Sequence, residues 1–355
     1  MSRTQTVLVT GAFGLVGSET VRQLMVEGHH VVATDLDVPA NRKAADNMPS
    51  TEVRWADLTD PDAVSTLLQA VSPAAIIHLA AIIPPACYAR PGLARRVNVD
   101  ATGLLIDAAA ALPNPPRFVQ ASSVAVYGAR NPHRLGDLLT ADTPLRPSDL
   151  YGVHKVEAEN LLRTSRLDWV ILRLGGVLTA EPRLDLDLDT LYFEASLPVD
   201  GRIQTVDVRD VARAFIAATT APVVGETLLI GGDESHRLMQ GDLAPSIAAA
   251  MGLVGGIPAG RKGDPDSDTD WFGTDWMDTA RSAEVLNFQW ISWPQLLTET
   301  AERMGWRRYP ARLAAPVMHA LLKHRSPYRR HPGRYADPWG VIDAKWPDPS
   351  SGSQR

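Results

Sequence analysis

The stretch TVLVTGAFGLVGSETVRQLMVEGHHVVATDLD, residues 6–37, decides the fold class of this chain. Its apolar run at 7–9 is too short for a helix and stops at Gly11, which is typical of a buried parallel strand. Apolar residues then recur at helical spacing over 16–25, Gly28 ends that helix, and HVVATD resumes as a second strand. The pattern predicts a strand–helix–strand unit with its glycines at the first turn.

The three glycines of this turn have separate tasks. Gly11 allows the tight turn, Gly14 lets the backbone approach a pyrophosphate, and Gly17 lets the helix pack on the strand. The helix N-terminus offers unpaired N–H groups and the positive end of its dipole to phosphates. Asp35 ends the second strand, where a carboxylate accepts hydrogen bonds from ribose hydroxyls and repels the 2′-phosphate of NADP. Because no arginine adjoins Asp35, we expect the cofactor to be NAD.

Further strands alternate with helices along the first half of the chain. VRWADLTD predicts a third strand with Asp57 at its end, AAIIHLAA a fourth that runs into His78, and RFVQASS a fifth over 118–121 that leads to Ser123. The alternation predicts an α/β fold, a doubly wound parallel sheet of the Rossmann type, with its site at the carboxyl ends of the strands. The residues expected at those ends are Gly11, Asp35, Asp57, His78, Ser123, Gly175 and Gly176. We assign His78 no catalytic role.

Composition narrows the class of protein. The 355 residues are 45% apolar and 21% charged, as in ordinary globular proteins. Cys87 is the single cysteine, which excludes a disulfide framework and a cysteine-based metal cluster, and the histidines show no metal-ligand spacing. We see no signal peptide and no apolar run long enough to span a membrane, and we expect a cytoplasmic protein. With a net charge of −6, we expect no nucleic-acid partner.

A second motif, YGVHK at 151–155, places Tyr151 and Lys155 on one face of a helix. With TGAFGLVG at 10–17, HLAA at 78–81, SSVAVYG at 122–128 and VDVRDVARAF at 206–215, the sequence resembles the extended short-chain dehydrogenase/reductase family, also called the NAD-dependent epimerase/dehydratase family. The five motifs stand in the family's order.

The resemblance implies a catalytic triad of Ser123, Tyr151 and Lys155. Ser123 is preferred to Ser122 because the family's serine stands four residues before the tyrosine of the YG pair, here Tyr127. The resemblance also implies a homodimer through two helices per subunit, near 100–112 and 151–165. The residues expected to bind NAD are Gly11, Phe13, Gly14, Leu15, Gly17, Asp35, Asp57, Leu58, Leu79, Ala80, Ala81, Asn98, Tyr151 and Lys155.

The chemistry of these residue types suits hydride transfer at a secondary alcohol, which also moves one proton at the oxygen. Free tyrosine has a pKa near 10, so a tyrosine base needs a group that favours the phenolate. Lys155 and the positive ring of NAD⁺ are expected to lower the pKa of Tyr151 by Coulomb attraction. Lys155 is also expected to hold the nicotinamide ribose, and Ser123 to hold the substrate oxygen.

The residues around the triad favour some reactions of the family over others. Family dehydratases carry acids after the catalytic serine or threonine, whereas Val124 and Ala125 stand here. The epimerase asparagine is missing after Arg173, and only Arg202 is a candidate to hold a diphosphate. We therefore predict an NAD-dependent dehydrogenase or reductase acting on a small molecule. Two alternatives stay open: a nucleotide-sugar epimerase with tightly bound NAD, and a non-catalytic NAD-binding scaffold or sensor.

The rest of the chain is expected to form a smaller C-terminal substrate lobe and a tail. We predict an NAD-binding domain with the catalytic residues over 1–178, a mainly substrate-binding lobe over 179–304 with some segments returning to the first domain, and a basic, partly disordered tail over 305–355.

Three features of this part carry separate expectations. We read the acids Asp185, Asp187 and Asp189 as a helix start or loop, because no glycine or closing glutamate follows at the spacing of a metal loop. ETLLIGG is assigned to the lobe, and Trp271, Phe272 and Trp276 are candidates to line its pocket.

The tail has eight Lys/Arg and no acid between 304 and 336, and a helix is expected over 316–324. We prefer a tail that wraps over the acidic body of its own or a neighbouring subunit. An acidic partner or an anionic membrane surface is the alternative. Residues beyond 347 are expected to be disordered.

Overall fold

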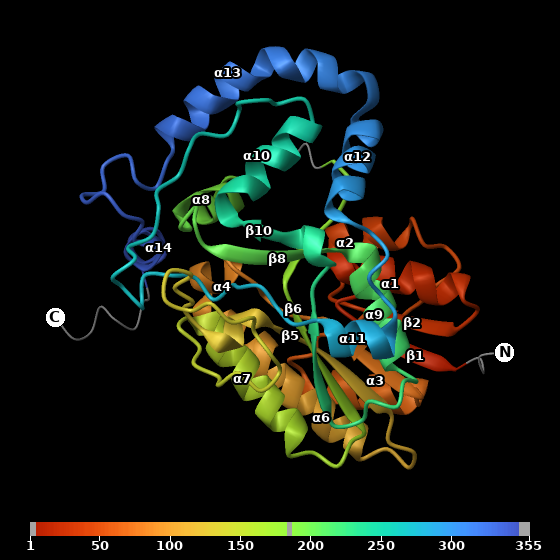
Figure 1. Ribbon diagram of the computed structural model, residues 1–355. Helices are drawn as coiled ribbons and strands as arrows, with labels where there is room; N and C mark the ends of the chain where they lie inside the picture. The colour runs from red at the N-terminus through yellow and green to blue at the C-terminus, as the bar shows by residue number, and fades with distance from the viewer. Residues whose placement is uncertain (1–4, 183–186, 348–355) are drawn as a thin grey trace.

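A seven-stranded parallel sheet forms the centre of the computed structural model, which describes residues 5–182 and 187–347 (Figure 1). The strand order is β3-β2-β1-β4-β5-β6-β9, and every neighbouring pair is parallel. The strands are β1 (Thr6–Thr10), β2 (His30–Thr34), β3 (Glu52–Val53), β4 (Ala75–His78), β5 (Arg117–Ser123), β6 (Trp169–Leu174) and β9 (Glu226–Ile230). Because β1 pairs with both β2 and β4, the strand order reverses there, and open sheets of this type bind ligands at that point.

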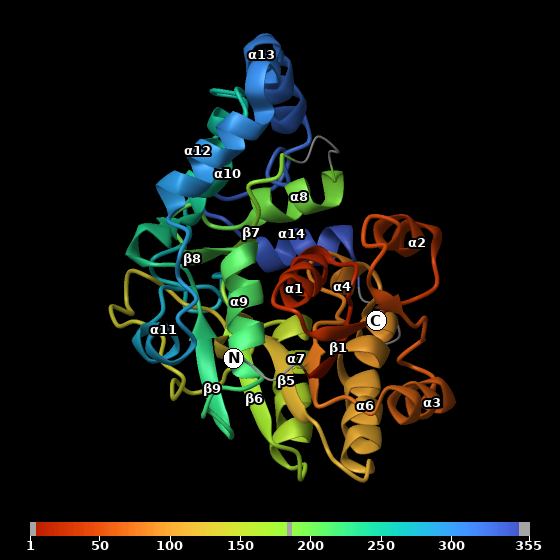
Figure 2. The same cartoon turned by 90° about the vertical axis from the view of Figure 1, so that its right-hand side faces the viewer.

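Helices cover both faces of this sheet, as the doubly wound prediction requires (Figures 1 and 2). One face carries α1 (Leu15–Val26), α9 (Val208–Ala218) and α11 (Ala280–Leu286), and the other carries α3 (Pro61–Val71), α6 (Ala101–Ala110) and α7 (Leu150–Arg163). Val21 and Phe215 belong to the core of the first face, and Leu67, Leu105 and Leu162 to the core of the second. The short helix α2 (Pro39–Ala45) follows β2 and buries no residue.

A second, three-stranded sheet lies beyond the carboxyl ends of the large sheet. Its order is β10-β8-β7, formed by β7 (Gly176–Leu178), β8 (Arg202–Asp207) and β10 (Arg237–Met239). Around it lie α8 (Leu188–Ser196), α10 (Gln240–Ala250), α12 (Trp293–Met304), α13 (Arg308–His324) and α14 (Pro338–Lys345). The remaining elements are short turns of helix: α4 (Ala86–Ala89), α5 (Pro91–Arg95), η1 (Arg96–Asp100), η2 (Val124–Tyr127), η3 (Glu234–His236) and η4 (Gly305–Arg307).

Two strands differ from the sequence predictions. The segment ETLLIGG does not belong to the lobe: its β9 pairs with β6 in the main sheet. Its two faces are therefore covered, which explains a continuous apolar run rather than an alternating one. The third strand is shorter than expected, although hydrogen bonds from Arg54 and Ala56 to carbonyls of 33 and 35 keep the chain beside β2 up to Asp57.

The tail helix is longer than predicted. It begins at Arg308 and continues through Pro316, because an exposed proline removes one backbone hydrogen bond without burying the freed carbonyl.

The tail packs on its own lobe, but not through the cations between 304 and 336. The Tyr328 hydroxyl donates to the Ser196 carbonyl at 2.5 Å, and Ile342 of α14 packs with Phe193 and Leu197. Within the described ranges, none of the eight Lys/Arg between 304 and 336 forms an ion pair with an acid. Packing and hydrogen bonds, together with the ion pair of Lys345 with Asp189 at 2.7 Å, therefore hold the tail on the lobe. The expected disorder beyond 347 concerns residues outside those the structure describes.

No helix within residues 5–182 and 187–347 is long and apolar enough to cross a bilayer. The same residues contain no group of three or more His, Cys, Asp or Glu placed to hold a metal ion. Asp187 caps the start of α8 by accepting from the amides of Asp189 and Thr190, so this acid is part of a helix start, as predicted. Asp185 lies outside the described residues.

Candidate active site

The turn from β1 to α1 is shaped by glycine. Gly11 has φ +64°, and a Cβ there would lie 2.7 Å from the amide nitrogen of Ala80. A Cβ on Gly17 would lie 2.1 Å from the Gly11 carbonyl oxygen, so the helix closes directly on the turn. A Cβ on Gly14 would meet only that carbonyl oxygen, at 3.4 Å. The turn thus leaves one backbone face open at a helix N-terminus, which fits a pyrophosphate.

Asp35 lies beside this turn, immediately after β2. Its carboxylate accepts hydrogen bonds from the backbone amides of Phe13 at 3.2 Å and Leu36 at 2.8 Å, and the side chain stays partly exposed. The nearest arginine in the sequence, Arg42, is bound to Asp37 at 2.5 Å. Asp35 therefore offers a carboxylate at this position, and the nearest arginine in the sequence is already paired, which fits NAD better than NADP.

Three other polar residues that the sequence singled out have local partners. Asp57 accepts from the amide and hydroxyl of Thr59 at 2.9 and 2.7 Å. Asn98 exchanges two hydrogen bonds with the backbone of Ile82, at 2.7 and 2.9 Å, and so holds the loop after β4. His78 is bonded through both ring nitrogens, to Thr10 of β1 and Thr102 of α6, and burial lowers its pKa to about 3. A neutral imidazole with hydrogen bonds at both ring nitrogens fits a structural role.

The start of α7 positions the proposed catalytic residues. Asp149 caps the helix by accepting from the Gly152 amide at 3.0 Å, and Tyr151 and Lys155 then lie one turn apart. The Lys155 ammonium donates to the Ala121 carbonyl of β5 at 2.8 Å and lies 5.6 Å from the centroid of the Tyr151 ring. Ser123 ends the same strand β5 and hydrogen-bonds Tyr151. Strand end and helix start therefore bring all three side chains together.

Burial sets the protonation of this group. Burial raises the pKa of the Tyr151 phenol, the negative charge expected on Asp149 raises it further, and only the hydrogen bond from Ser123 opposes them. Burial also lowers the pKa of Lys155 to about 8, against the attraction of Glu159. Among the protein's own groups, burial therefore sets the pKa of Tyr151, and the phenol stays protonated at neutral pH. The expected lowering of this pKa by Lys155 together with the ring of NAD⁺ stays a prediction.

A buried ion-pair network fixes the geometry behind the triad. Arg173 of β6 donates to both oxygens of Glu159 on α7, at 2.9 and 2.7 Å, and both side chains are buried. Ser122 donates to the same carboxylate at 2.6 Å. Successive residues of a strand point to opposite faces, so Ser122 is used in this network while Ser123 faces Tyr151. The catalytic role of Ser123 stays a prediction.

The glycine turn and the triad open onto one cavity of about 410 Å³. The predicted site residues that line it are Gly11, Gly14, Leu15, Gly17, Leu79, Ala81, Ser123, Tyr151 and Lys155. The predicted cofactor residues outside its lining are Phe13, Asp35, Asp57, Leu58, Ala80 and Asn98. Among the three aromatic candidates, Phe272 lines the cavity, whereas Trp271 is buried against Gly263 and Trp276 stacks with Arg202.

Sequence reasoning missed two polar residues of this cavity, Glu194 and Gln240. The Gln240 amide donates to the Glu194 carboxylate at 2.8 Å, and burial raises the pKa of that carboxyl. The only signal in the sequence is a lone acid in the apolar run LYFEAS.

Comparison with known proteins agrees with this architecture. The sequence model of the NAD dependent epimerase/dehydratase family matches residues 7–190. The chain belongs to this family. Among curated family relatives, D-erythronate dehydrogenase of Cupriavidus necator is 36% identical over 186 residues, which are 48% of this chain and 55% of the relative. UDP-glucose 4-epimerase of Mycolicibacterium smegmatis is 34% identical over 257 residues, 70% of this chain and 74% of the relative.

Solved structures of the family share the fold. UDP-glucose 4-epimerase from Thermotoga maritima, solved with UDP-glucose, superposes with a TM-score of 0.68 at 19% identity, covering 86% of this chain and 99% of that one. The chain spans about half the length of some of the curated relatives it matches, 55% of the D-erythronate dehydrogenase and 46% of a UDP-glucose 4-epimerase from Lactobacillus helveticus. These relatives differ in reaction, so the family alone does not select one.

Proposed function

We propose that this protein is an NAD-dependent dehydrogenase or reductase that interconverts a secondary alcohol and a ketone on a small molecule. The observation that supports this most directly is the shared cavity: Ser123, Tyr151 and Lys155 open onto the same space as the glycine turn. NAD, when bound, supplies a hydride acceptor and its reduced form a hydride donor. Gly11, Gly14 and Gly17 would hold its pyrophosphate, and Asp35 its adenosine ribose.

The protein's own groups handle the proton at the substrate oxygen. Ser123 positions that oxygen by hydrogen bonding, and the Tyr151 hydroxyl exchanges a proton with it. Since burial keeps the pKa of Tyr151 above its usual value, the phenol is protonated at neutral pH and is set to donate. Reduction of a ketone therefore needs no prior ionisation of Tyr151, whereas oxidation requires the proton to leave first.

The polar groups of the cavity favour this reaction over two others of the family. Val124 and Ala125 are both buried and apolar, so no acid stands next to Ser123 to promote loss of water. Arg202, the candidate to hold a diphosphate, does not line the cavity. Its guanidinium donates to the carbonyls of Leu135 and Pro132 and lies 4.7 Å from the Trp276 ring centroid. None of the described residues that line this cavity is an arginine, so a nucleotide sugar would find no guanidinium among them.

Retention of the cofactor separates the dehydrogenase from the epimerase, because an epimerase oxidises and reduces the same substrate without releasing NADH. Protein purified without added NAD is expected to be largely free of nucleotide and to bind added NAD reversibly. Near-stoichiometric NAD released on denaturation would refute the dehydrogenase and favour the epimerase. Absence of any NAD binding would refute both, and binding without turnover on any alcohol would favour the scaffold.

We also propose a cytoplasmic homodimer that pairs through α6 and α7. Val153 and Leu161 of α7 are 38% and 39% exposed and lie two helical turns apart, which suits an apolar contact between copies. The single cysteine, buried and free, suits a reducing compartment. Light scattering at micromolar concentration is expected to give twice the 38.5 kDa of the chain. A monomeric mass would refute the dimer and leave the catalytic proposal untouched.

A further inference from the structure

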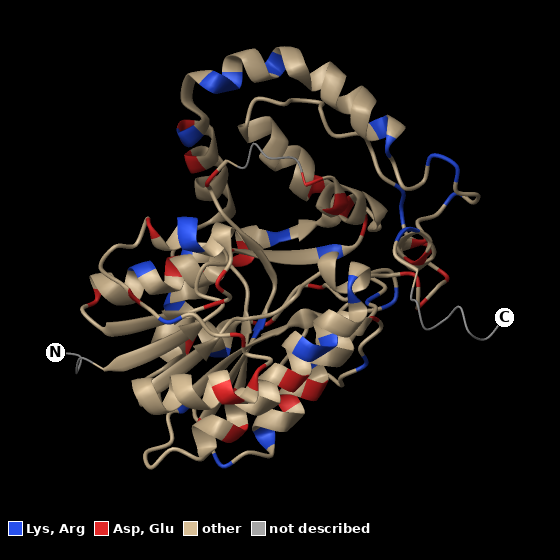
Figure 3. Ribbon diagram, turned by 180° about the vertical axis from the view of Figure 1, so that it is seen from behind, with Lys and Arg blue, Asp and Glu red and all other residues tan. Residues whose placement is uncertain are grey.

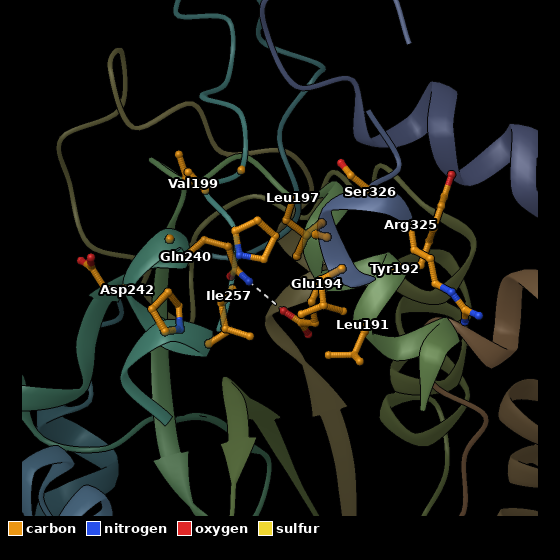
Figure 4. A pocket seen from close by; sticks show the side chains of 18 of the residues that line it. Leu191, Tyr192, Glu194, Leu197, Val199, Gln240, Asp242, Ile257, Arg325 and Ser326 are labelled. Atoms are coloured by element: carbon orange, nitrogen blue, oxygen red, sulfur yellow. Dashed lines mark hydrogen bonds between the residues drawn. The ribbon is translucent and has the colours of Figure 1, made fainter. Parts of the chain in front are cut away.

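A second, larger cavity of about 750 Å³ lies in the C-terminal lobe, next to the active site (Figure 4). Glu194, Leu197 and Gln240 line both cavities, so the hydrogen-bonded pair of Glu194 and Gln240 stands at their junction. We call this second cavity the outer chamber. Its volume is in the range of ligand pockets, and it is larger than the active-site cavity.

The lining of the outer chamber is mainly apolar. The apolar lining comes from three segments: Leu191 lies on α8, Ile257 in the loop after α10, and Leu322 on α13. At the junction, the Gln240 side chain is 9% exposed and its oxygen has no hydrogen-bond partner among the described residues. A buried polar atom without a partner is unfavourable, so a ligand group that donates a hydrogen bond would be stabilised there.

Charge is placed unevenly around the chamber. Arg325 lies on one side and Asp242 on the other (Figure 4). Lys345 also lines the chamber, but it is bound to Asp189 at 2.7 Å, whereas Arg325 forms no ion pair among the described residues. An anionic group is therefore favoured at the Arg325 side.

We propose that the outer chamber binds the apolar body of the substrate, with an anionic group at Arg325 and the reacting alcohol or ketone at Tyr151. This deepens the proposed function by naming its substrate class, an apolar molecule with a negative charge remote from the reacting carbon. The chamber depends on Leu322 and Arg325 of the tail, so the tail completes the substrate site.

The test uses 1-anilinonaphthalene-8-sulfonate, an apolar anion, at saturating NAD so that the cofactor site is filled. Wild type is expected to bind one probe with enhanced fluorescence. Ala244→Trp, which fills the chamber, is expected to weaken binding at least tenfold, and Arg325→Ala about fivefold. Arg330→Ala is the matched control, an exposed tail arginine outside the lining, and is expected to bind like wild type.

The outcomes separate this proposal from the proposed function. The proposal for the outer chamber would be refuted by any of three results: wild type that does not bind the probe, Ala244→Trp that binds it as tightly as wild type, or the same loss of affinity in the two arginine variants. Tyr151→Phe is expected to keep probe binding and to lose turnover. Probe binding therefore tests the outer chamber even if the protein turns out not to be a dehydrogenase.

A separate observation concerns the outer face of α13, the helix at the far edge of the lobe (Figures 1 and 2). Tyr309, Leu313, Val317 and Leu321 follow one another at four-residue spacing and are 66%, 83%, 70% and 37% exposed. We call these four residues the outer stripe. Trp306, which precedes the helix, is 74% exposed. The opposite side of α13 faces the lobe, where Ala315 is buried and Leu322 lines the chamber.

The charge around the outer stripe has one sign. Arg312 and Lys323 are exposed on α13, Arg325 follows its last residue, and no acid occurs between 304 and 336 (Figure 3). A helix with an apolar stripe, flanking cations and a neighbouring tryptophan suits the interface of an anionic bilayer, where the stripe enters the acyl boundary and the cations face headgroups. The four residues of the outer stripe are exposed to solvent, so they are free to contact a bilayer.

We infer that α13 docks the protein onto anionic membranes. The probe is sedimentation with vesicles of phosphatidylcholine containing 30% phosphatidylglycerol, compared with phosphatidylcholine alone. Wild type is expected to sediment only with the anionic vesicles, and Arg312→Ala to bind about fivefold more weakly. The double variant Leu313→Glu with Val317→Glu is expected to lose binding at least tenfold, because charge enters the apolar boundary.

Val26→Glu supplies the matched control. Val26 is 78% exposed on α1, outside the tail, so this variant adds a charge without touching the outer stripe and is expected to bind like wild type. The inference is overturned if anionic vesicles leave wild type in the supernatant, or if Val26→Glu weakens binding as much as the double variant. It is also overturned if the double variant still binds vesicles and instead changes the mass measured by light scattering, which would make the stripe an interface between copies.

Discussion

Glu159→Gln tests the network that holds the proposed catalytic helix on the sheet. Glu159 is fully buried and pairs with Arg173, whose side chain is only 2% exposed. Removing one charge of a buried pair leaves the other unpaired and costs about 3–5 kcal/mol. For unfolding of a chain of 355 residues, this corresponds to a Tm lower by roughly 4–7 °C.

A second glutamate on the same helix supplies the control. Glu157 pairs with Arg95 at 2.9 Å, but the two side chains are 38% and 51% exposed. Exposed pairs contribute about 0–1 kcal/mol, so Glu157→Gln is expected to change Tm by roughly 1 °C or less. Thermal unfolding followed by circular dichroism at pH 7 measures both variants. Equal shifts would refute the argument that burial gives the Glu159 pair its importance.

The pH dependence of this variant has a defined sign. Burial alone would raise the pKa of Glu159, but the hydrogen bonds and charge of Arg173 hold it below its usual 4.5. The stabilisation is therefore present above about pH 4.5 and is lost as pH falls through the folded-state pKa. The difference in Tm between wild type and Glu159→Gln is expected to shrink under acidic conditions. Loss of Glu159 also removes an attraction that raises the pKa of Lys155, so that pKa falls further in the variant.

Two further predictions concern the cofactor turn and the lysine. Gly11→Ala is expected to weaken NAD binding at least tenfold in a calorimetric titration, because its Cβ would lie 2.7 Å from the Ala80 amide nitrogen. Gly28→Ala is the control: Gly28 also has a positive φ, but its Cβ would meet nothing within 4 Å. This variant is expected to lose only about 1 kcal/mol of stability and to bind NAD normally. Lys155→Met is expected to abolish turnover yet to raise the free energy of unfolding by about 2 kcal/mol at pH 7. Burial lowers the pKa of Lys155 from 10.5 to about 8, so removing the charge stabilises the folded state, and loss of the hydrogen bond to Ala121 offsets part of that stabilisation. The penalty for burying the Lys155 charge disappears as pH rises from 8 to 10.5. The extra free energy of unfolding of Lys155→Met, measured by chemical denaturation, is therefore expected to disappear over the same range. A gain that is absent at pH 7 or constant with pH would contradict this.

The sequence predicts the first half of the fold well because its signals are local. The glycine turn at 11–17, the strand ends at His78 and Ser123, and α7 with Tyr151 all follow from spacing within a few residues. Period and turn chemistry are short-range properties, so one chain suffices to read them. The family resemblance then names the candidate catalytic residues without further geometry.

The features that the sequence does not predict depend on contacts between distant segments. A short apolar strand such as β9 does not state which sheet it joins, and only its pairing with β6 assigns it to the main sheet. The hydrogen bond between Glu194 and Gln240 joins helices far apart in the chain. The rise in the pKa of Tyr151 also depends on burial, which the spacing from Tyr151 to Lys155 does not show.

The most direct test of the account compares wild type and Tyr151→Phe in NADH-dependent reduction of a ketone panel that includes apolar keto acids, with NAD affinity measured on the same samples. Loss of the proton donor is expected to lower turnover by about 10²–10⁴-fold while the Kd for NAD stays within about twofold. A phenylalanine variant that binds NAD and turns over at the wild-type rate would contradict the assignment of Tyr151 as the group that moves the proton.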